Sequence, residues 1–255
     1  MNQKSNKTAL VTGGSRGLGR DMALSLAKKG FNVVITYHNN KDKAEEVVKE
    51  IQSIGPKSFS LQLDTRVTGQ FDPFVQKLKD LLMEHTGKAH LYSLINNAGT
   101  ALYAPIADTT EEQLDETISI HFKGVFFLTQ KLLPVLEDGG RIINISSGLA
   151  RFSLPGYSVY GSMKGAMEVL TRYQAKELGS RGITSNIVAP GAIETDFGGG
   201  MVRDNKDLNQ MIGNMTALGR AGLPEDIGGV VAFLCSDEAG WINAQRIEVS
   251  GGMNL

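Results

Sequence analysis

The sequence predicts an α/β protein in which helices flank one seven-stranded, parallel, doubly wound sheet. Short apolar runs alternate with longer amphipathic segments along almost the whole chain. The runs are continuously apolar, which is typical of strands buried on both faces, and glycines follow several of them. Strands that alternate with helices imply right-handed crossovers between parallel strands.

Each element follows from one segment of this pattern. The expected strands are residues 8–12, 32–37, 58–63, 91–96, 141–146, 184–189 and 245–250. The expected helices are Leu18–Lys29, Asp42–Ile54, Phe71–Glu84, Glu111–Leu136, Tyr160–Leu178 and Pro224–Leu234. No linker rich in Pro or Ser divides them, so residues 1–255 are expected to form a single domain. Residues 196–216 are polar and glycine-hinged, which favours a mobile substrate lid.

The composition argues against several classes of partner. The 26 basic and 27 acidic residues leave a net charge of −1, so we expect no general attraction to nucleic acid or to a membrane surface. Cys235 is the single cysteine, which fits a reducing compartment. The apolar run near the N-terminus is too short for a secretory signal, and no run approaches the ~20 apolar residues of a membrane span. We therefore expect a cytoplasmic protein.

A glycine-rich loop follows the first expected strand and leads directly into a helix. It reads Thr12-Gly13-Gly14-Ser15-Arg16-Gly17-Leu18-Gly19. Glycines at such a turn let the backbone approach a pyrophosphate, and the helix N-terminus offers free N–H groups and a partial positive charge. The spacing is G-x-x-x-G-x-G, so an ordinary tight turn remains the alternative. The position after the first strand of a βαβ series favours phosphate binding.

A second polar segment, Asn96-Asn97-Ala98-Gly99, ends the fourth expected strand. The carboxyl ends of strands form the ligand crevice of an open α/β sheet. Small residues here leave room for a dinucleotide, although they could simply turn the chain.

Three polar residues form a candidate catalytic set. Ser147 ends the fifth expected strand, and Tyr160 and Lys164 share one face of the following helix. A tyrosine with its ordinary pKa near ~10 is a poor acid at neutral pH, but a nearby ammonium stabilises the phenolate. The serine hydroxyl can hold a carbonyl oxygen against the tyrosine. A Tyr/Lys pair alone is often a surface pair; the glycine loop favours the catalytic interpretation. No metal site is predicted.

Together with Pro190-Gly191 and the terminal Ser250-Gly251-Gly252, these motifs resemble the short-chain dehydrogenase/reductase family, and in particular its 3-oxoacyl-reductase-like members. The match is colinear over nearly the whole chain. The resemblance implies a Rossmann domain, an acid/base role for Tyr160 and a ribose contact from Lys164. The same resemblance places Asp64 against adenine and Asn96 against the adenosine ribose. It places Pro190, Gly191, Ile193 and Thr195 at the nicotinamide end, and adds Ala98 and Gly99 as further cofactor contacts.

His121 departs from the family pattern. The family usually has an asparagine at this position, where it is thought to anchor a water in a proton relay to the lysine. A histidine can also donate and accept, so His121 is a catalytic candidate. Simple packing of its ring against the helix is the open alternative.

The end of the second expected strand predicts the cofactor. An NAD enzyme places an acid there, which binds the ribose 2′-hydroxyl and repels a 2′-phosphate. The residues here are Tyr37, His38 and Asn39, none of them acidic. Arg16 can reach the 2′-phosphate region, and arginine binds phosphate bidentately. NADP(H) is therefore preferred, and NAD(H) stays possible if Arg16 is only a solvated loop charge.

We expect reduction of a small-molecule carbonyl by NADPH. Two enzymatic alternatives stay open: reduction of 3-oxoacyl chains on acyl carrier protein, with Lys176 and Arg181 as basic docking positions, and alcohol oxidation. A dinucleotide-binding sensor without turnover is the non-enzymatic alternative. Small residues in 160–178 let another backbone come close, and residues 111–136 carry apolar side chains. The family resemblance implies that these two helices pair in a homodimer or homotetramer, although both could pack only on their own sheet.

Overall fold

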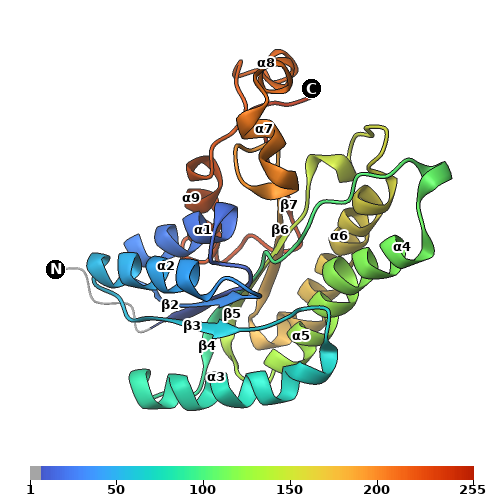
Figure 1. Ribbon diagram of the computed structural model, residues 1–255. Helices are drawn as coiled ribbons and strands as arrows, with labels where there is room; N and C mark the ends of the chain where they lie inside the picture. Colours follow the sequence, from blue (N-terminus) through green and yellow to red (C-terminus); the bar gives the residue numbers. More distant parts are fainter. Residues whose placement is uncertain (1–6) are drawn as a thin grey trace.

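The computed structural model describes residues 7–255 and confirms the α/β fold (Figure 1). The seven parallel strands lie in the order β3-β2-β1-β4-β5-β6-β7. They are β1 (Thr8–Val11), β2 (Asn32–Tyr37), β3 (Ser58–Gln62), β4 (Leu91–Asn96), β5 (Leu136–Ile145), β6 (Thr184–Pro190) and β7 (Arg246–Val249). The direction of winding reverses between β1 and β4, which places the ligand crevice of such a sheet at their carboxyl ends.

Helices cover both faces of the sheet. They are α1 (Gly17–Lys28), α2 (Lys41–Ile54), α3 (Phe71–Thr86), α4 (Glu111–Ile118), α5 (Gly124–Leu132), α6 (Ser158–Leu178), α7 (Met201–Asp204), α8 (Lys206–Asn214) and α9 (Glu225–Leu234). One apolar cluster joins the sheet to α1, α2 and α9, and a second joins it to α3 and α5. The inner strands are therefore buried on both faces, which explains why their sequences read as continuous apolar runs.

The expected helix over Glu111–Leu136 is wrong in two respects. A π-helical segment, Ser119–Lys123, separates α4 from α5, and the chain already enters β5 at Leu136. Val135 and Leu136 belong to the same buried cluster as Leu132 of α5, so the apolar pattern continues from helix into strand without a break. Single π-helical turns inside helices are frequent at functional sites.

The predicted lid segment, residues 196–216, is largely helical. It contains a short turn over Phe197–Gly200, followed by α7 and α8. Gly198, Gly199 and Gly200 have φ values of 61°, 75° and 79°, a left-handed conformation that favours glycine. These glycines lie at the start of the segment, where the hinge is expected; the hinge and the mobility of the segment stay predictions.

Within residues 7–255, no helix combines the length and the apolarity needed to cross a membrane. Residues 1–6, part of the terminal segment used in the argument against a secretory signal, lie outside the described residues.

A buried carboxylate joins α1 to α9. Asp21 is 7% exposed, and its Oδ2 accepts a hydrogen bond from the Gly228 N–H at 3.0 Å. A side chain at Gly228 would overlap this carboxylate, so glycine lets the two helices meet here. Burial, with Glu225 nearby, raises the pKa of Asp21 to about 6. The native state therefore bears a cost for ionising Asp21 at neutral pH.

Asp21→Asn should stabilise the protein at pH 7.5, because the amide oxygen still accepts from Gly228 and no charge is buried. The folded pKa lies above the unfolded value, so this residue's contribution to stability is present below about pH 4 and is lost as the pH rises through about 6. We expect thermal unfolding to show a Tm about 2–6 °C higher for the variant at pH 7.5 and little difference at pH 4.5. A lower Tm at both pH values would contradict this account.

Candidate active site

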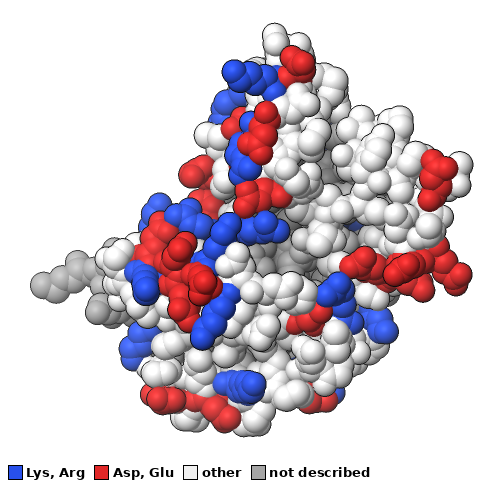
Figure 2. Space-filling model, in the orientation of Figure 1, with Lys and Arg blue, Asp and Glu red and all other residues white. Residues whose placement is uncertain are grey.

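A cleft of about 800 Å³ opens over the carboxyl ends of the strands, bounded on one side by residues 196–216. Figure 2 shows it as a hollow with Lys and Arg side chains gathered along one part of its rim. The predicted residues that line it are Gly13, Ser15, Arg16, Gly17, Leu18, Gly19, Tyr37, His38, Asn39, Asp64, Ala98, Gly99, His121, Ser147, Tyr160, Lys164, Pro190, Gly191, Ile193 and Thr195. The fold thus brings together residues from six strand ends.

The glycine loop has the close backbone packing of a phosphate cradle. Gly13 and Gly17 have φ values of 65° and 53°, and a side chain at Gly19 would overlap the carbonyl oxygen of Gly13. The N-terminus of α1 has no capping side-chain hydrogen bond, and its first residues, Gly17 and Leu18, line the cleft. These features fit the pyrophosphate of a dinucleotide cofactor.

Two residues of the predicted motifs that were not themselves predicted as site residues hold this cradle in place. The Asn97 side chain donates to the carbonyl oxygens of Thr12 (2.8 Å) and Gly13 (3.2 Å). The Thr12 hydroxyl accepts from the N–H groups of Asn97 and Ala98 at 2.9 and 3.0 Å. The loops after β1 and β4 are therefore joined side by side at the switch point.

Asn96 is the predicted site residue that does not line the cleft. Its Nδ2 donates to Asn144 Oδ1 at 2.9 Å and to Thr129 Oγ1 at 3.2 Å, inside a buried polar network. Successive side chains of a strand point to opposite faces, so Asn96 lies beneath the sheet while Asn97 reaches the loop. The expectation that Asn96 packs against the adenosine ribose does not fit this placement.

Tyr160 and Lys164 lie deep in the cleft, on the first turns of α6. They are 7% and 6% exposed, and Lys164 Nζ donates to the Ile145 carbonyl at 2.9 Å. Ser147 hydrogen-bonds with Tyr160, and Ser147 Oγ accepts from the Leu149 N–H at 3.2 Å. The end of β5 therefore supplies a partner to both helical residues.

Burial governs the protonation of this set. It raises the pKa of Tyr160 well above the ordinary range, and the Ser147 hydrogen bond offsets only part of that effect. Burial lowers the pKa of Lys164 to about 8. Tyr160 is thus held as a neutral phenol with a proton to donate, and a lysine that titrates near neutral pH lies 5.4 Å from its ring centroid.

His121 lies in the π-helical segment and contacts Tyr160 edge-on, with ring centroids 5.2 Å apart. Its Nε2 lies 2.8 Å from the Thr100 carbonyl, so Nε2 carries the hydrogen, and Nδ1 has no hydrogen-bond partner among the described residues. Burial, and then the charge of Lys164, lowers the pKa of His121 to about 3. A charged His121 at neutral pH, one way to join a relay, is therefore disfavoured.

The structure also explains why glycines surround His121. A side chain at Gly99 would lie 2.7 Å from the imidazole Cε1, and one at Gly124 would overlap the Thr65 carbonyl oxygen. The π-helical segment therefore packs closely against the chain at Gly99 and at Thr65. The neutral imidazole lies between the Thr100 carbonyl and the Tyr160 ring.

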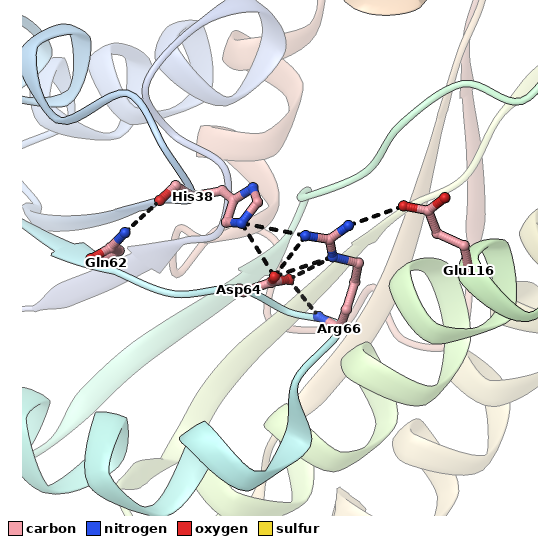
Figure 3. Close-up of polar contacts among 5 residues, drawn as sticks. All are labelled: His38, Gln62, Asp64, Arg66 and Glu116. Atoms are coloured by element: carbon pink, nitrogen blue, oxygen red, sulfur yellow. Dashed lines mark hydrogen bonds and ion pairs between the residues drawn. The ribbon is translucent and has the colours of Figure 1, made fainter.

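The far end of the cleft carries charged and polar groups. No acid follows β2, and Arg16 is 61% exposed, with Nη1 3.7 Å from Asp196. Lys43 Nζ lies 4.0 Å from the same carboxylate. Asp64, His38, Arg66 and Glu116 form a hydrogen-bonded cluster (Figure 3). Arg66 and Glu116 line the cleft but could not be identified from the sequence, because a lone charge in a loop or on a helix carries no signal of its position.

The opposite end of the cleft is apolar. Its walls include Leu149, Phe152, Leu154, Phe197, Val202, Leu208, Met211, Ile212, Met215 and Met253. Six of these ten residues come from residues 196–216; that this segment covers a substrate stays a prediction. No group of three or more His, Cys, Asp and Glu side chains able to hold a metal ion occurs within residues 7–255.

Comparisons with known proteins agree with this geometry. Residues 13–254 match the sequence model of a protein family described as Enoyl-(Acyl carrier protein) reductase. A 3-oxoacyl-[acyl-carrier-protein] reductase, FabG of Staphylococcus epidermidis, is 40% identical over 252 residues, covering 98% of this chain and all of FabG.

Solved structures agree equally well. The reductase LugOII, described as catalysing keto-reduction at C1 during lugdunomycin biosynthesis, has a TM-score of 0.94 and 38% identity, with full coverage of both chains. The angucycline C-6 ketoreductase LanV with bound NADP has a TM-score of 0.93 and 38% identity over 98% of this chain and 96% of that one.

Fold and cleft together define an NAD(P)-dependent oxidoreductase that interconverts C=O and CH–OH groups. The chain belongs to the short-chain dehydrogenase/reductase family, as its motifs indicated. This membership disfavours the alternative of a dinucleotide sensor without turnover.

The environment of His121 predicts a pH-dependent contribution to stability. Because the folded pKa of about 3 lies below the ordinary value of ~6.5, the contribution is present above pH ~6.5 and is lost as the pH falls. Chemical denaturation should show a smaller loss of stability between pH 7.5 and 5 for His121→Asn than for the parent. His121→Ala should cost about 1–3 kcal/mol, because the Thr100 carbonyl loses its donor. A parental pH–rate inflection near 6.5 that His121→Asn removes would contradict a neutral His121.

Proposed function

We propose that this protein reduces a ketone on a bulky, mainly apolar small molecule to the alcohol, with NADPH as the hydride source. The observation that carries this proposal is the buried phenol of Tyr160, kept protonated and hydrogen-bonded to Ser147 at the meeting point of a phosphate cradle and an apolar pocket. A protonated acid at this position suits the reductive direction, and the reaction remains reversible.

The residues of the chain divide the work in three. The cofactor, once bound, supplies the hydride to the carbonyl carbon. Tyr160 donates its phenolic proton to the carbonyl oxygen, and the Ser147 hydroxyl hydrogen-bonds the same oxygen. Lys164, anchored on the Ile145 carbonyl with its ammonium 5.4 Å from the Tyr160 ring centroid, favours the phenolate that forms. The apolar lid residues exclude water from the reacting atoms.

NADP(H) is the proposed cofactor, with NAD(H) as a weaker substitute. The absence of an acid after β2 and the loosely paired Arg16 support this preference. The related LanV structure was determined with bound NADP, and a blue fluorescent protein with a TM-score of 0.88 and 32% identity was determined with NADPH.

Two classes of substrate are candidates. FabG relatives favour an acyl chain on acyl carrier protein, whereas LanV with bound NADP and rabelomycin, and a hydroxynaphthalene reductase-like protein of Metarhizium brunneum at 36% identity, favour a free ring compound. Arg181, a candidate docking residue, donates to Asp138 at 2.7 Å and to two backbone carbonyls near the start of β5. Its charge is thus compensated at the amino ends of the strands, the end of the sheet opposite the cleft, so we favour the free ring compound.

A homodimer or homotetramer in the cytoplasm is the proposed state. Phe126 and Phe127 of α5, and Val169 and Tyr173 of α6, are between 38% and 62% exposed, more than isolated packing on the sheet explains.

Cys235 is buried and free, which fits a reducing compartment.

Tyr160→Phe should abolish most turnover, because the ring stays and the transferable proton is lost. With a bicyclic aromatic ketone as substrate, we expect kcat for NADPH oxidation to fall about 10²-fold or more while the Kd for NADPH changes little. Tyr157→Phe, which removes the hydroxyl of a neighbouring tyrosine at the cleft wall, is the control. Turnover of Tyr160→Phe within a few-fold of the parent would exclude Tyr160 as the acid.

Arg16→Ala tests cofactor choice. It should weaken NADPH binding by roughly 1.5–3 kcal/mol, through loss of a charge-assisted contact, and leave NADH binding nearly unchanged. Fluorescence titration of both cofactors measures this, with Arg172→Ala on the exposed face of α6 as the control. An equal loss for both cofactors would assign Arg16 to the pyrophosphate or to the fold.

A further inference from the structure

The carboxylate of Asp64, the expected partner of adenine, is fully engaged within the protein (Figure 3). Its Oδ1 accepts from the Arg66 backbone N–H at 3.0 Å and from Arg66 Nε at 2.9 Å. Its Oδ2 accepts from Arg66 Nη2 at 2.8 Å and from Arg66 Nε at 3.2 Å, so Arg66 alone makes four contacts to the carboxylate. A carboxylate has about four lone-pair positions, so little capacity remains for an amino group of a ligand.

The N–H groups of the Arg66 guanidinium, which lie in its plane, are bonded to neighbouring side chains. Nε and Nη2 bond Asp64, Nη1 donates to Glu116 Oε1 of α4 at 3.0 Å, and Nη2 lies 3.4 Å from His38 Nε2. The side chain is nevertheless 39% exposed and lines the cleft. With its edge occupied on both sides, the surface that it offers to a ligand is the flat face of the guanidinium.

The charges around Arg66 decide what this face can bind. Two carboxylates, Asp64 and Glu116, outweigh one guanidinium, so the corner is not attractive to a phosphate. The less tightly paired cations Arg16 and Lys43 lie elsewhere, beside Asp196. A neutral, planar, electron-rich ring suits the face of an arginine, which stacks on such rings.

We propose that the adenine ring of the cofactor stacks on the guanidinium face of Arg66, and that Asp64 is a positioning residue which fixes this plane. Recognition of adenine then depends on its flat surface and not on its amino group. The proposal rests on the proposed function only in taking an adenine dinucleotide as the cofactor of this cleft.

The distinguishing probe is deamino-NADPH, in which hypoxanthine replaces adenine. This change removes the amino donor and leaves a planar bicyclic ring. Fluorescence titration of the unaltered protein should give Kd values for NADPH and deamino-NADPH within about threefold of each other. A Kd for deamino-NADPH tenfold or more above that for NADPH would overturn the proposal, because the amino group would then be recognised. This arm needs no variant.

Arg66→Lys keeps the charge and removes the plane. We expect the Kd to rise by about tenfold for both NADPH and deamino-NADPH, and to stay unchanged for reduced nicotinamide mononucleotide, which lacks the adenosine. Arg220→Lys is the matched control, since Arg220 is chelated by Asp226 away from the main cleft. If Arg66→Lys binds NADPH as tightly as Arg220→Lys does, the proposal is wrong.

Two further variants separate the roles within the cluster. Glu116→Gln leaves the Asp64 contacts of Arg66 intact and should change the Kd for NADPH by less than about threefold. Asp64→Asn should weaken NADPH and deamino-NADPH equally; a loss confined to NADPH would return the adenine contact to Asp64. Tight NADPH binding without ketone reduction would refute the proposed function and leave this inference standing. Absence of NADPH binding in the unaltered protein would refute both.

Discussion

The joint between the loops after β1 and β4 is the contact on which the rest of the site depends. Asn97 donates to two carbonyls of the first loop, and the Thr12 hydroxyl accepts from two N–H groups of the second. A side chain at Gly13 would lie 3.0 Å from the Ala98 Cα, so the approach is close enough to require a residue without one. This joint sets the floor of the cleft where the winding of the sheet reverses.

At the substrate end of the cleft, burial determines the protonation of the catalytic side chains. Tyr160, Lys164 and His121 are each less than 10% exposed, and the loss of solvent moves all three toward their neutral forms. A neutral imidazole beside a neutral phenol can space and orient it without competing for the proton. The π-helical segment makes this possible, because it turns His121 toward Thr100 and Tyr160.

At the other end of the cleft, charge is arranged in two separate groups. Arg16 and Lys43 share one carboxylate and lie on the exposed rim, whereas Arg66 is tightly compensated by Asp64 and Glu116. An anionic group of a ligand is thus attracted to the Arg16 and Lys43 side chains, whereas a neutral ring suits the charge-compensated Arg66. Such a separation of charged and neutral surroundings helps to orient a cofactor before the reaction.

Hydrophobic pattern and local spacing determined the order of strands and helices, the glycine loop, and the pairing of Tyr160 with Lys164, because each depends on residues a few positions apart. Tertiary structure alone decided the rest. Whether Asn96 or Asn97 faces the cleft depends on the register of β4 in the sheet. The π-helical segment within 111–136 packs against Gly99 through His121, and Gly124 beside it packs against the Thr65 carbonyl; the Arg66–Glu116 bridge joins residues 50 positions apart. Such contacts arise from packing between distant segments, which a linear pattern does not record.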